Sequence, residues 1–218
     1  MQDESIELLT ILNNISTSIF ETKKSNRSRI KNQRFSDVHV RNFLYDNVIN
    51  QLNIPLSFLT KEIERVLNLI PIYTQFLKHV EGLTIYDAAS LICLIKDIER
   101  FPKFNNLLAY TGFVPKSRRN YNKRIHNLLL KISYDLSQKN VVYMFVYEQA
   151  YEDLLKKHPQ RTKEHIHNMA KRVVVKQFLK ELYFNWKRLN KKEELGDFYV
   201  YYNLLSYVER LWWYLYDR

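Results

Sequence analysis

Apolar residues recur along the chain at spacings of three and four residues, which is the period of an amphipathic α-helix. This spacing predicts helices over 4–20, 36–52, 56–80, 85–98, 104–110, 123–138, 140–157 and 162–188. Pro71 lies inside one of these segments and should kink or split it. The pattern therefore predicts an all-α, multi-helix fold.

The few glycines support this fold and mark its turns. The chain has only 3 glycines in 218 residues, too few for the many hairpins of a β-sandwich or barrel. They are also too far apart for a phosphate-binding glycine loop. Thr84 followed by Asp87 resembles a capping box at a helix start, and Gly112 is placed to end the helix over 104–110.

Two further segments stand apart by composition. Residues 21–34 carry six basic residues against one acid, with serine and asparagine between them, which is typical of a flexible basic arm. Residues 198–216 are rich in tyrosine and tryptophan. Helix packing or self-association suits this aromatic segment best, and a platform for stacking bases is the alternative.

The charge balance limits the partners. Lys and Arg number 34 against 23 Asp and Glu, a net charge of +11, and the pI is near 9.5. Such a chain favours a polyanion, either nucleic acid or an anionic membrane surface. The apolar run 141–147 is too short to span a bilayer. The single cysteine, Cys93, and the acidic N-terminus without a secretory pattern predict an intracellular protein, cytoplasmic or nucleoid-associated.

Residues 76–115 carry a series of short elements that together are more specific than each alone. They are Val80-Glu81-Gly82-Leu83-Thr84, Ala88-Ala89, Asp97-Ile98-Glu99-Arg100-Phe101 and Leu107-Leu108-Ala109-Tyr110-Thr111-Gly112-Phe113-Val114-Pro115. In order and spacing this stretch resembles the C-terminal helical domain of insertion-sequence transposases that pair a RuvC-like DEDD nuclease domain with a serine recombinase activity. The resemblance extends over about 51–188.

The resemblance implies a domain organisation. It suggests a transposase-like helical domain over 51–190, while periodicity and composition predict N-terminal helices with a basic arm over 1–50 and an aromatic C-terminal helix over 191–218. Within the domain it implies a long linker helix over 51–78, followed by a helix-hairpin-helix-like turn.

Three departures from the family pattern weaken the case for catalysis. About fifty residues precede the linker helix, too few for the nuclease domain and its four acids. Thr84 replaces the second glycine of the turn. The family places its nucleophilic serine in a glycine-containing loop after the Gly-x-x-Pro element, whereas here the only nearby serine, Ser117, is offset in a loop without glycine. We expect no catalytic residue, with Ser117 as a weak candidate.

Three groups of residues are candidates for contact with nucleic acid. The turn around Gly82 would offer backbone N–H groups to phosphates, and cations with an interleaved tyrosine suit phosphates and bases. An ordinary turn and charged, solvated surfaces are the alternatives. The candidates are Gly82, Leu83 and Thr84 of the turn, Lys116, Arg118, Arg119, Tyr121, Lys123 and Arg124 of the following loop, and Lys171, Arg172 and Lys176 of a late helix.

No metal or cofactor site is expected. His165 and His167 are two residues apart and so point to different sides of a helix. No cysteine or carboxylate completes a tetrahedral set around them. Cys93 lies in an apolar helix and should be buried and unreactive.

These observations predict a non-catalytic protein that binds DNA through its phosphate backbone, with RNA left open because phosphate contacts do not separate the two. One alternative is a recombinase or transposase subunit that acts with a partner in trans. A second alternative is a structural assembly protein that forms a homo-oligomer through its aromatic C-terminal helix.

Overall fold

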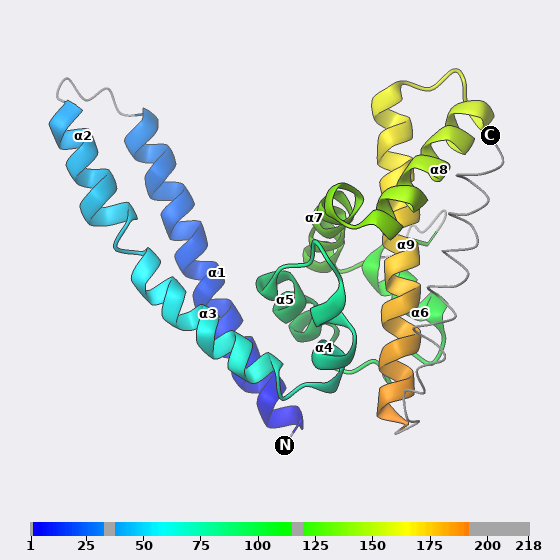
Figure 1. Ribbon diagram of the computed structural model, residues 1–218, viewed down its shortest axis with the longest axis horizontal. Coiled ribbons are helices and arrows are strands. Elements are labelled where there is room, and N and C mark those ends of the chain that lie inside the picture. The colour runs from blue at the N-terminus through cyan, green and yellow to red at the C-terminus, as the bar shows by residue number, and fades with distance from the viewer. Residues whose placement is uncertain (1, 33–37, 115–119, 192–218) are drawn as a thin grey trace. The chain divides into compact units, whose positions relative to one another are not determined.

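The computed structural model describes residues 2–32, 38–114 and 120–191. These residues form helices and no strand, which confirms the all-α prediction. They fall into two compact units (Figure 1). Unit 1 is built from the described residues within 1–79 and 83–97, and unit 2 from those within 80–82 and 98–191. The predicted aromatic helix over 198–216 lies outside the described residues.

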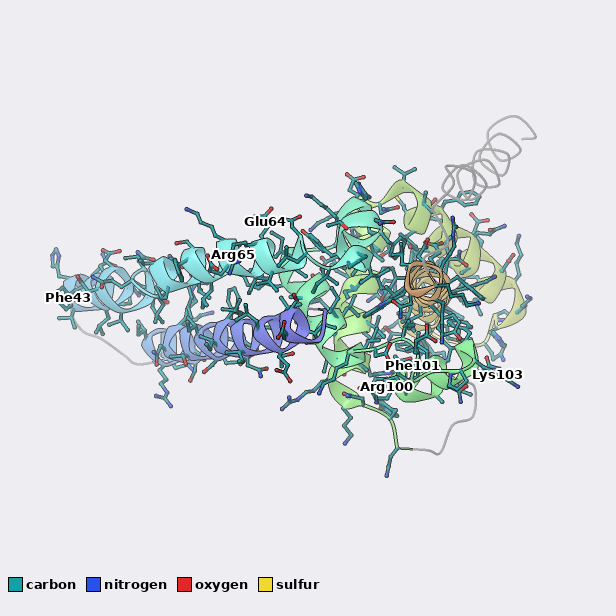
Figure 2. All side chains as sticks on the ribbon, turned by 90° about the horizontal axis from the view of Figure 1, so that it is seen from below. Phe43, Glu64, Arg65, Arg100, Phe101 and Lys103 are labelled. Carbon is teal, nitrogen blue, oxygen red and sulfur yellow. The ribbon has the colours of Figure 1, made fainter. Side chains whose placement is uncertain are left out.

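Unit 1 contains a helical hairpin. Its first limb is α1 (Gln2–Asn32), and its second limb is α2 (Val38–Leu44), the π-helical turn η1 (Tyr45–Ile49) and α3 (Asn53–Leu67). α1 packs against η1 and α3 (Figure 1). Phe43 lies toward the end of the hairpin that is far from the N-terminus (Figure 2).

The basic segment 21–34 is not a flexible arm as far as the structure describes it. α1 continues through this segment to Asn32. The segment has neither glycine nor proline, and lysine and arginine are good helix formers. Lys23 Nζ donates to Asn53 Oδ1 of α3, and Ile30 is buried. These contacts hold the basic part of α1 against the second limb.

The predicted linker helix is split at Pro71, as expected. α3 ends at Leu67, and Ile70 is extended with φ −104° and ψ 115°. Pro71 then starts α4 (Pro71–Gln75), which is followed by the 3₁₀ turn η2 (Leu77–His79). Proline suits the first position of a helix, because the N–H that it lacks would have no partner there.

α5 (Ile85–Ile95) packs against α1 and α3. Thr84 caps it, because its Oγ1 accepts from the Asp87 N–H at 3.2 Å, so this predicted cap is confirmed. Ser90 Oγ donates to Asn13 Oδ1 of α1 at 3.2 Å. α5 ends three residues earlier than predicted, since Lys96 takes φ +62° and the Asp97 N–H donates to the Ile95 carbonyl at 2.8 Å in a γ-turn.

Unit 2 is organised around one long helix. α9 (Lys163–Asn190) packs against α6 (Phe104–Thr111), α7 (Lys123–Lys139) and α8 (Val141–Lys157). Phe178 and Trp186 of α9 are among the largest fully buried side chains. Asn140 separates α7 from α8, and its Oδ1 caps α8 by accepting from the N–H groups of Val142 and Tyr143.

The contact between α8 and α9 includes the half-buried carboxyl group of Glu181. Glu181 Oε2 accepts from the Tyr143 hydroxyl at 2.5 Å, and Glu181 Oε1 accepts from Gln177 Nε2 at 2.7 Å. Desolvation raises the pKa of Glu181 despite these two hydrogen bonds. A glutamate whose pKa is raised by folding binds its proton more tightly in the folded state, so folding stability falls as pH rises past its ordinary pKa.

Replacing Glu181 by Gln should remove this pH dependence. The amide keeps an acceptor for Tyr143 and carries no charge at high pH. We expect Glu181→Gln to have a higher Tm than the unmodified chain at pH 8, with the difference vanishing below the ordinary glutamate pKa of about 4.3. Thermal unfolding followed by circular dichroism across this range measures it. A Tm difference that does not change with pH would contradict the proposed burial of the carboxylate.

Candidate nucleic-acid interface

The connection from α5 to α6 is anchored in unit 2 by aromatic and cationic contacts. Phe101 is 5% exposed. The Arg100 guanidinium lies over the rings of Phe101 and Tyr110, 5.1 and 4.9 Å from their centroids. Figure 2 shows Arg100 and Phe101 next to each other, with Lys103 a short distance along the chain. Arg100 is therefore held at the base of α6 by cation–π contacts.

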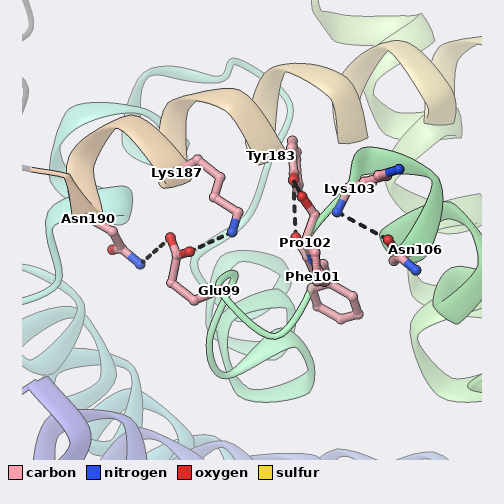
Figure 3. Close-up of polar contacts among 8 residues, drawn as sticks. All are labelled: Glu99, Phe101, Pro102, Lys103, Asn106, Tyr183, Lys187 and Asn190. Carbon is pink, nitrogen blue, oxygen red and sulfur yellow. Dashed lines mark hydrogen bonds and ion pairs between the residues drawn. The ribbon is translucent and has the colours of Figure 1, made fainter.

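The same connection is tied to the last turns of α9 (Figure 3). Lys187 Nζ donates to Glu99 Oε2 at 2.6 Å, and this hydrogen bond lowers the pKa of the Glu99 carboxyl. The Tyr183 hydroxyl lies 3.0 Å from the Phe101 carbonyl and 3.2 Å from the Pro102 carbonyl. The Glu99 carboxylate is thus bonded to side chains of α9.

Gly112 lies where the end of α6 meets the start of α7. It ends α6 with φ +79°, as predicted for a C-terminal glycine. A Cβ at this position would lie 2.7 Å from the Tyr121 ring and 3.0 Å from His126 Nδ1. His126 Nδ1 donates to the Thr111 carbonyl at 2.9 Å, and its ring stacks on Phe113. The absence of a side chain at Gly112 lets α7 dock here.

The first turn of α7 is fixed by Asn122. Its backbone N–H donates to the Tyr110 carbonyl at 2.9 Å, and its Nδ2 donates to the Tyr110 hydroxyl at 2.8 Å. Its Oδ1 caps α7 by accepting from the N–H groups of Arg124 and Ile125. Lys123 and Arg124 follow directly, are exposed, and have no acidic residue beside them in the first turn. Two cations therefore stand at the positive end of the α7 dipole.

These elements belong to a stretch of sequence without acids. No aspartate or glutamate stands between Glu99 and Asp135, whereas eight basic residues do. They are Arg100, Lys103, Lys116, Arg118, Arg119, Lys123, Arg124 and Lys131. Because Arg100 lies on Tyr110, and Tyr110 is bonded to Asn122, Arg100 shares one corner of unit 2 with the start of α7. We call this corner, defined by Arg100, Tyr110, Asn122, Lys123 and Arg124, the basic corner.

The structure separates the predicted turn from the basic corner. Gly82, with φ +90°, lies against the last turns of α7, where a Cβ would be 3.2 Å from the Asp135 carbonyl oxygen and 3.3 Å from Lys139 Cβ. Asn140 Nδ2 donates to the Glu81 carbonyl at 3.3 Å. Gly82 is therefore explained by close packing at the opposite end of α7. Leu83 and Thr84 belong to unit 1.

The predicted cations of α9 are also away from the start of α7. Lys171 Nζ lies 5.2 Å from the centroid of the Tyr134 ring, near the end of α7. Arg172 is exposed and Lys176 is half-buried, four residues apart on one face of α9. The candidate residues thus form separate groups rather than one cluster.

The loop after Gly112 is described at residues 113–114 and again from residue 120. Lys116, Ser117, Arg118 and Arg119 lie outside the described residues. Tyr121, which was expected to stack on a base, packs with its ring centroid 4.8 Å from that of His126 while remaining 39% exposed. Its position on Gly112 gives it a packing role beside any role in binding.

The histidines have separate partners. His165 Nε2 pairs with Arg161, and His167 Nδ1 shares a 2.5 Å hydrogen bond with the Tyr147 hydroxyl, so the two point to different sides, as predicted. Desolvation lowers the pKa of His167. Within the described ranges, no three His, Cys, Asp or Glu side chains come together in a way that could hold a metal ion. Cys93 is buried, and burial raises its pKa, as expected of an unreactive thiol.

Arg100 and Asn122 complete the basic corner but were not among the predicted residues. The length of the acid-free stretch is a signal that could have found Arg100, because it begins there. Asn122 also bonds to Tyr110, twelve residues away, and helical periodicity does not show this contact.

Comparison with known proteins adds no relative: no protein-family model, no curated protein and no solved structure matches the chain. Among the described helices, none has both the length and the apolar character needed to cross a membrane.

Replacing Gly112 by Ala should loosen the basic corner. The new methyl group would clash with the Tyr121 ring, and a non-glycine residue is strained at this positive φ. We expect a loss of about 2 kcal/mol or more in the free energy of unfolding, and a Tm lower by roughly 4–8 °C. Asn105→Ala, at an exposed position of α6, serves as the control and should change Tm little. A Gly112→Ala variant as stable as this control would contradict the close approach of α6 and α7.

Proposed function

We propose that the chain binds nucleic acid without catalysing a reaction, and that the basic corner of unit 2 contacts the phosphate backbone. The observation that carries the proposal is the acid-free stretch between Glu99 and Asp135. This stretch holds eight basic residues and no acid in the sequence, and two of them, Lys123 and Arg124, are exposed in the first turn of α7 with no acidic residue in that turn. Phosphate contacts of this kind dominate the affinity of proteins for nucleic acids.

The arrangement at the start of α7 is unfavourable without an anion. The N-terminus of a helix carries the positive end of its dipole, and acids are normally preferred there. Lys123 and Arg124 instead add two positive charges in the first turn. Each positive charge at the N-terminal end of a helix lowers the stability of that helix by roughly 0.3–1 kcal/mol when salt does not screen it. A phosphate group between these side chains would turn this repulsion into attraction.

The expected partner is DNA, by the resemblance of residues 76–115 to a transposase domain. The relation to transposases itself stays a prediction from the sequence. RNA presents the same phosphates, so the basic corner alone does not select between them. Ser117 is left out of the proposal, since its place in the chain already departs from the family pattern.

Removing the two cations at the start of α7 should weaken binding in a way that depends on salt. For the variant Lys123→Gln/Arg124→Gln we expect weaker affinity for a DNA duplex. The slope of log affinity against log salt concentration should fall by about 2, because each lost phosphate contact removes about one unit. Fluorescence anisotropy with a labelled duplex between low and physiological salt measures this slope.

A matched variant controls for net charge. Lys156→Gln/Lys157→Gln removes two cations from the last turn of α8, where positive charge is favourable to the helix. It should leave the slope unchanged. Equal effects of the two variants would mean that binding follows net charge rather than the basic corner, and affinity that does not depend on salt would refute phosphate binding altogether. Repeating the titration with an RNA duplex compares the two nucleic acids.

A further inference from the structure

α1 has one face that its own unit covers and another that it leaves exposed. On the covered face, Leu9 and Ser16 are buried. Asn13 of the same face accepts a hydrogen bond from Ser90 of α5. On the other face, Leu8, Ile11 and Ile15 are 41%, 56% and 45% exposed. These residues lie three and four positions apart and begin a seam of the kind that pairs two helices in a coiled coil. We call this line of residues the seam of α1.

The seam continues beyond these residues with small hydroxyl side chains. At the same spacing follow Ser18, Thr22 and Ser25, all exposed. Six successive seam positions therefore carry no charge, which is unusual for a solvated helix face. The Thr22 hydroxyl donates to the Ser18 carbonyl at 2.9 Å, so it can be covered without losing its hydrogen bond. One half of the seam is bulky and the other half is small.

The charges along α1 divide in the same way. Glu4 and Glu7 stand in the first half, whereas the second half carries Lys23, Lys24, Arg27, Arg29 and Lys31 against one acid, Glu21. Two parallel copies of α1 would bring like charges together. Two antiparallel copies would place the acidic half of each against the basic half of the other, and bulky seam residues against small ones.

We propose that the chain forms a homodimer in which the seam of α1 pairs antiparallel with the seam of a second copy. A twofold axis near Ser16 and Thr17 aligns every bulky residue with a small one: Leu8 faces Ser25, Ile11 faces Thr22, and Ile15 faces Ser18. In this register Glu4 faces Arg29. A self-complementary patch of this kind is what twofold symmetry requires.

The small half of the seam borders a shallow region of the surface that is open to solvent. Ser25 and Arg29 line it, together with Glu21, Lys24, Ser28 and Asn32, and its volume is about 570 Å³. The partner's Leu8 would enter beside Ser25. This interface lies wholly on α1, so it does not depend on the basic corner or on the aromatic residues 198–216.

Cysteine cross-linking of the full chain tests both the pairing and its direction. Ile11→Cys and Thr22→Cys are made as single variants; native Cys93 is buried. In the antiparallel register, residue 11 meets residue 22 of the partner. Two copies of the same variant position would instead lie about 16 Å apart along the helix, too far for a disulfide. Mild oxidation should therefore link a mixture of the two variants, as seen on a non-reducing gel, and neither variant alone.

The control is Val141→Cys on α8, which has the same 56% exposure as Ile11. Mixed with Thr22→Cys it should give no cross-link. Cross-linking of either single variant by itself would overturn the proposal in favour of a parallel dimer. A mixture of Ile11→Cys and Thr22→Cys that gives no more cross-link than the control would overturn dimerisation through α1.

Charge reversal supplies a second readout that leaves the seam intact. Glu4→Arg and Arg29→Glu should each raise the dimer dissociation constant, roughly tenfold, because each reversal acts twice in a twofold dimer. The double variant should recover the original constant. Light scattering with size exclusion should show the unmodified chain at twice its mass of 26.5 kDa. A monomer at micromolar concentration, or a double variant weaker than either single one, would overturn the proposal.

Discussion

The packing of Tyr121 and His126 on Gly112 holds the start of α7 against the end of α6, and the basic corner of unit 2 depends on this contact. A side chain at Gly112 would meet the Tyr121 ring at 2.7 Å, so only glycine allows α6 and α7 to approach this closely. Asn122 then bonds to Tyr110, and Tyr110 carries Arg100 on its ring. A packing constraint at the junction of α6 and α7 thereby brings three cations, Arg100, Lys123 and Arg124, to one corner.

Much of the helical pattern could be predicted because it depends on local spacing. The split at Pro71, the cap at Thr84 and the end of α6 at Gly112 all follow from residues that act on their immediate neighbours. The helix through 21–32 could not be predicted in this way. Its serine, asparagine and lysine residues are typical of a linker. The contacts of Lys23 and Ile30 that hold this part of α1 against the second limb come from residues distant in sequence.

The candidate site shows the same limit more strongly. Basic residues and an interleaved tyrosine can be identified from composition, but their partners cannot. Tyr121 packs on His126, and Gly82 is needed by the end of α7, so two residues assigned to binding have structural roles. Conversely, the absence of acids between Glu99 and Asp135 is visible in the sequence. The sequence does not show that the contact between α6 and α7 brings basic residues of this stretch together.

We propose that the basic corner at the start of α7 binds nucleic acid. Hydrogen–deuterium exchange of the full chain, with and without a DNA duplex at low salt, tests it most directly. We expect slower exchange on binding in peptides that cover 98–104 and 120–127, and no change in those that cover the second half of α8. Protection that appears in α8 and is missing from both of the first two regions would contradict it.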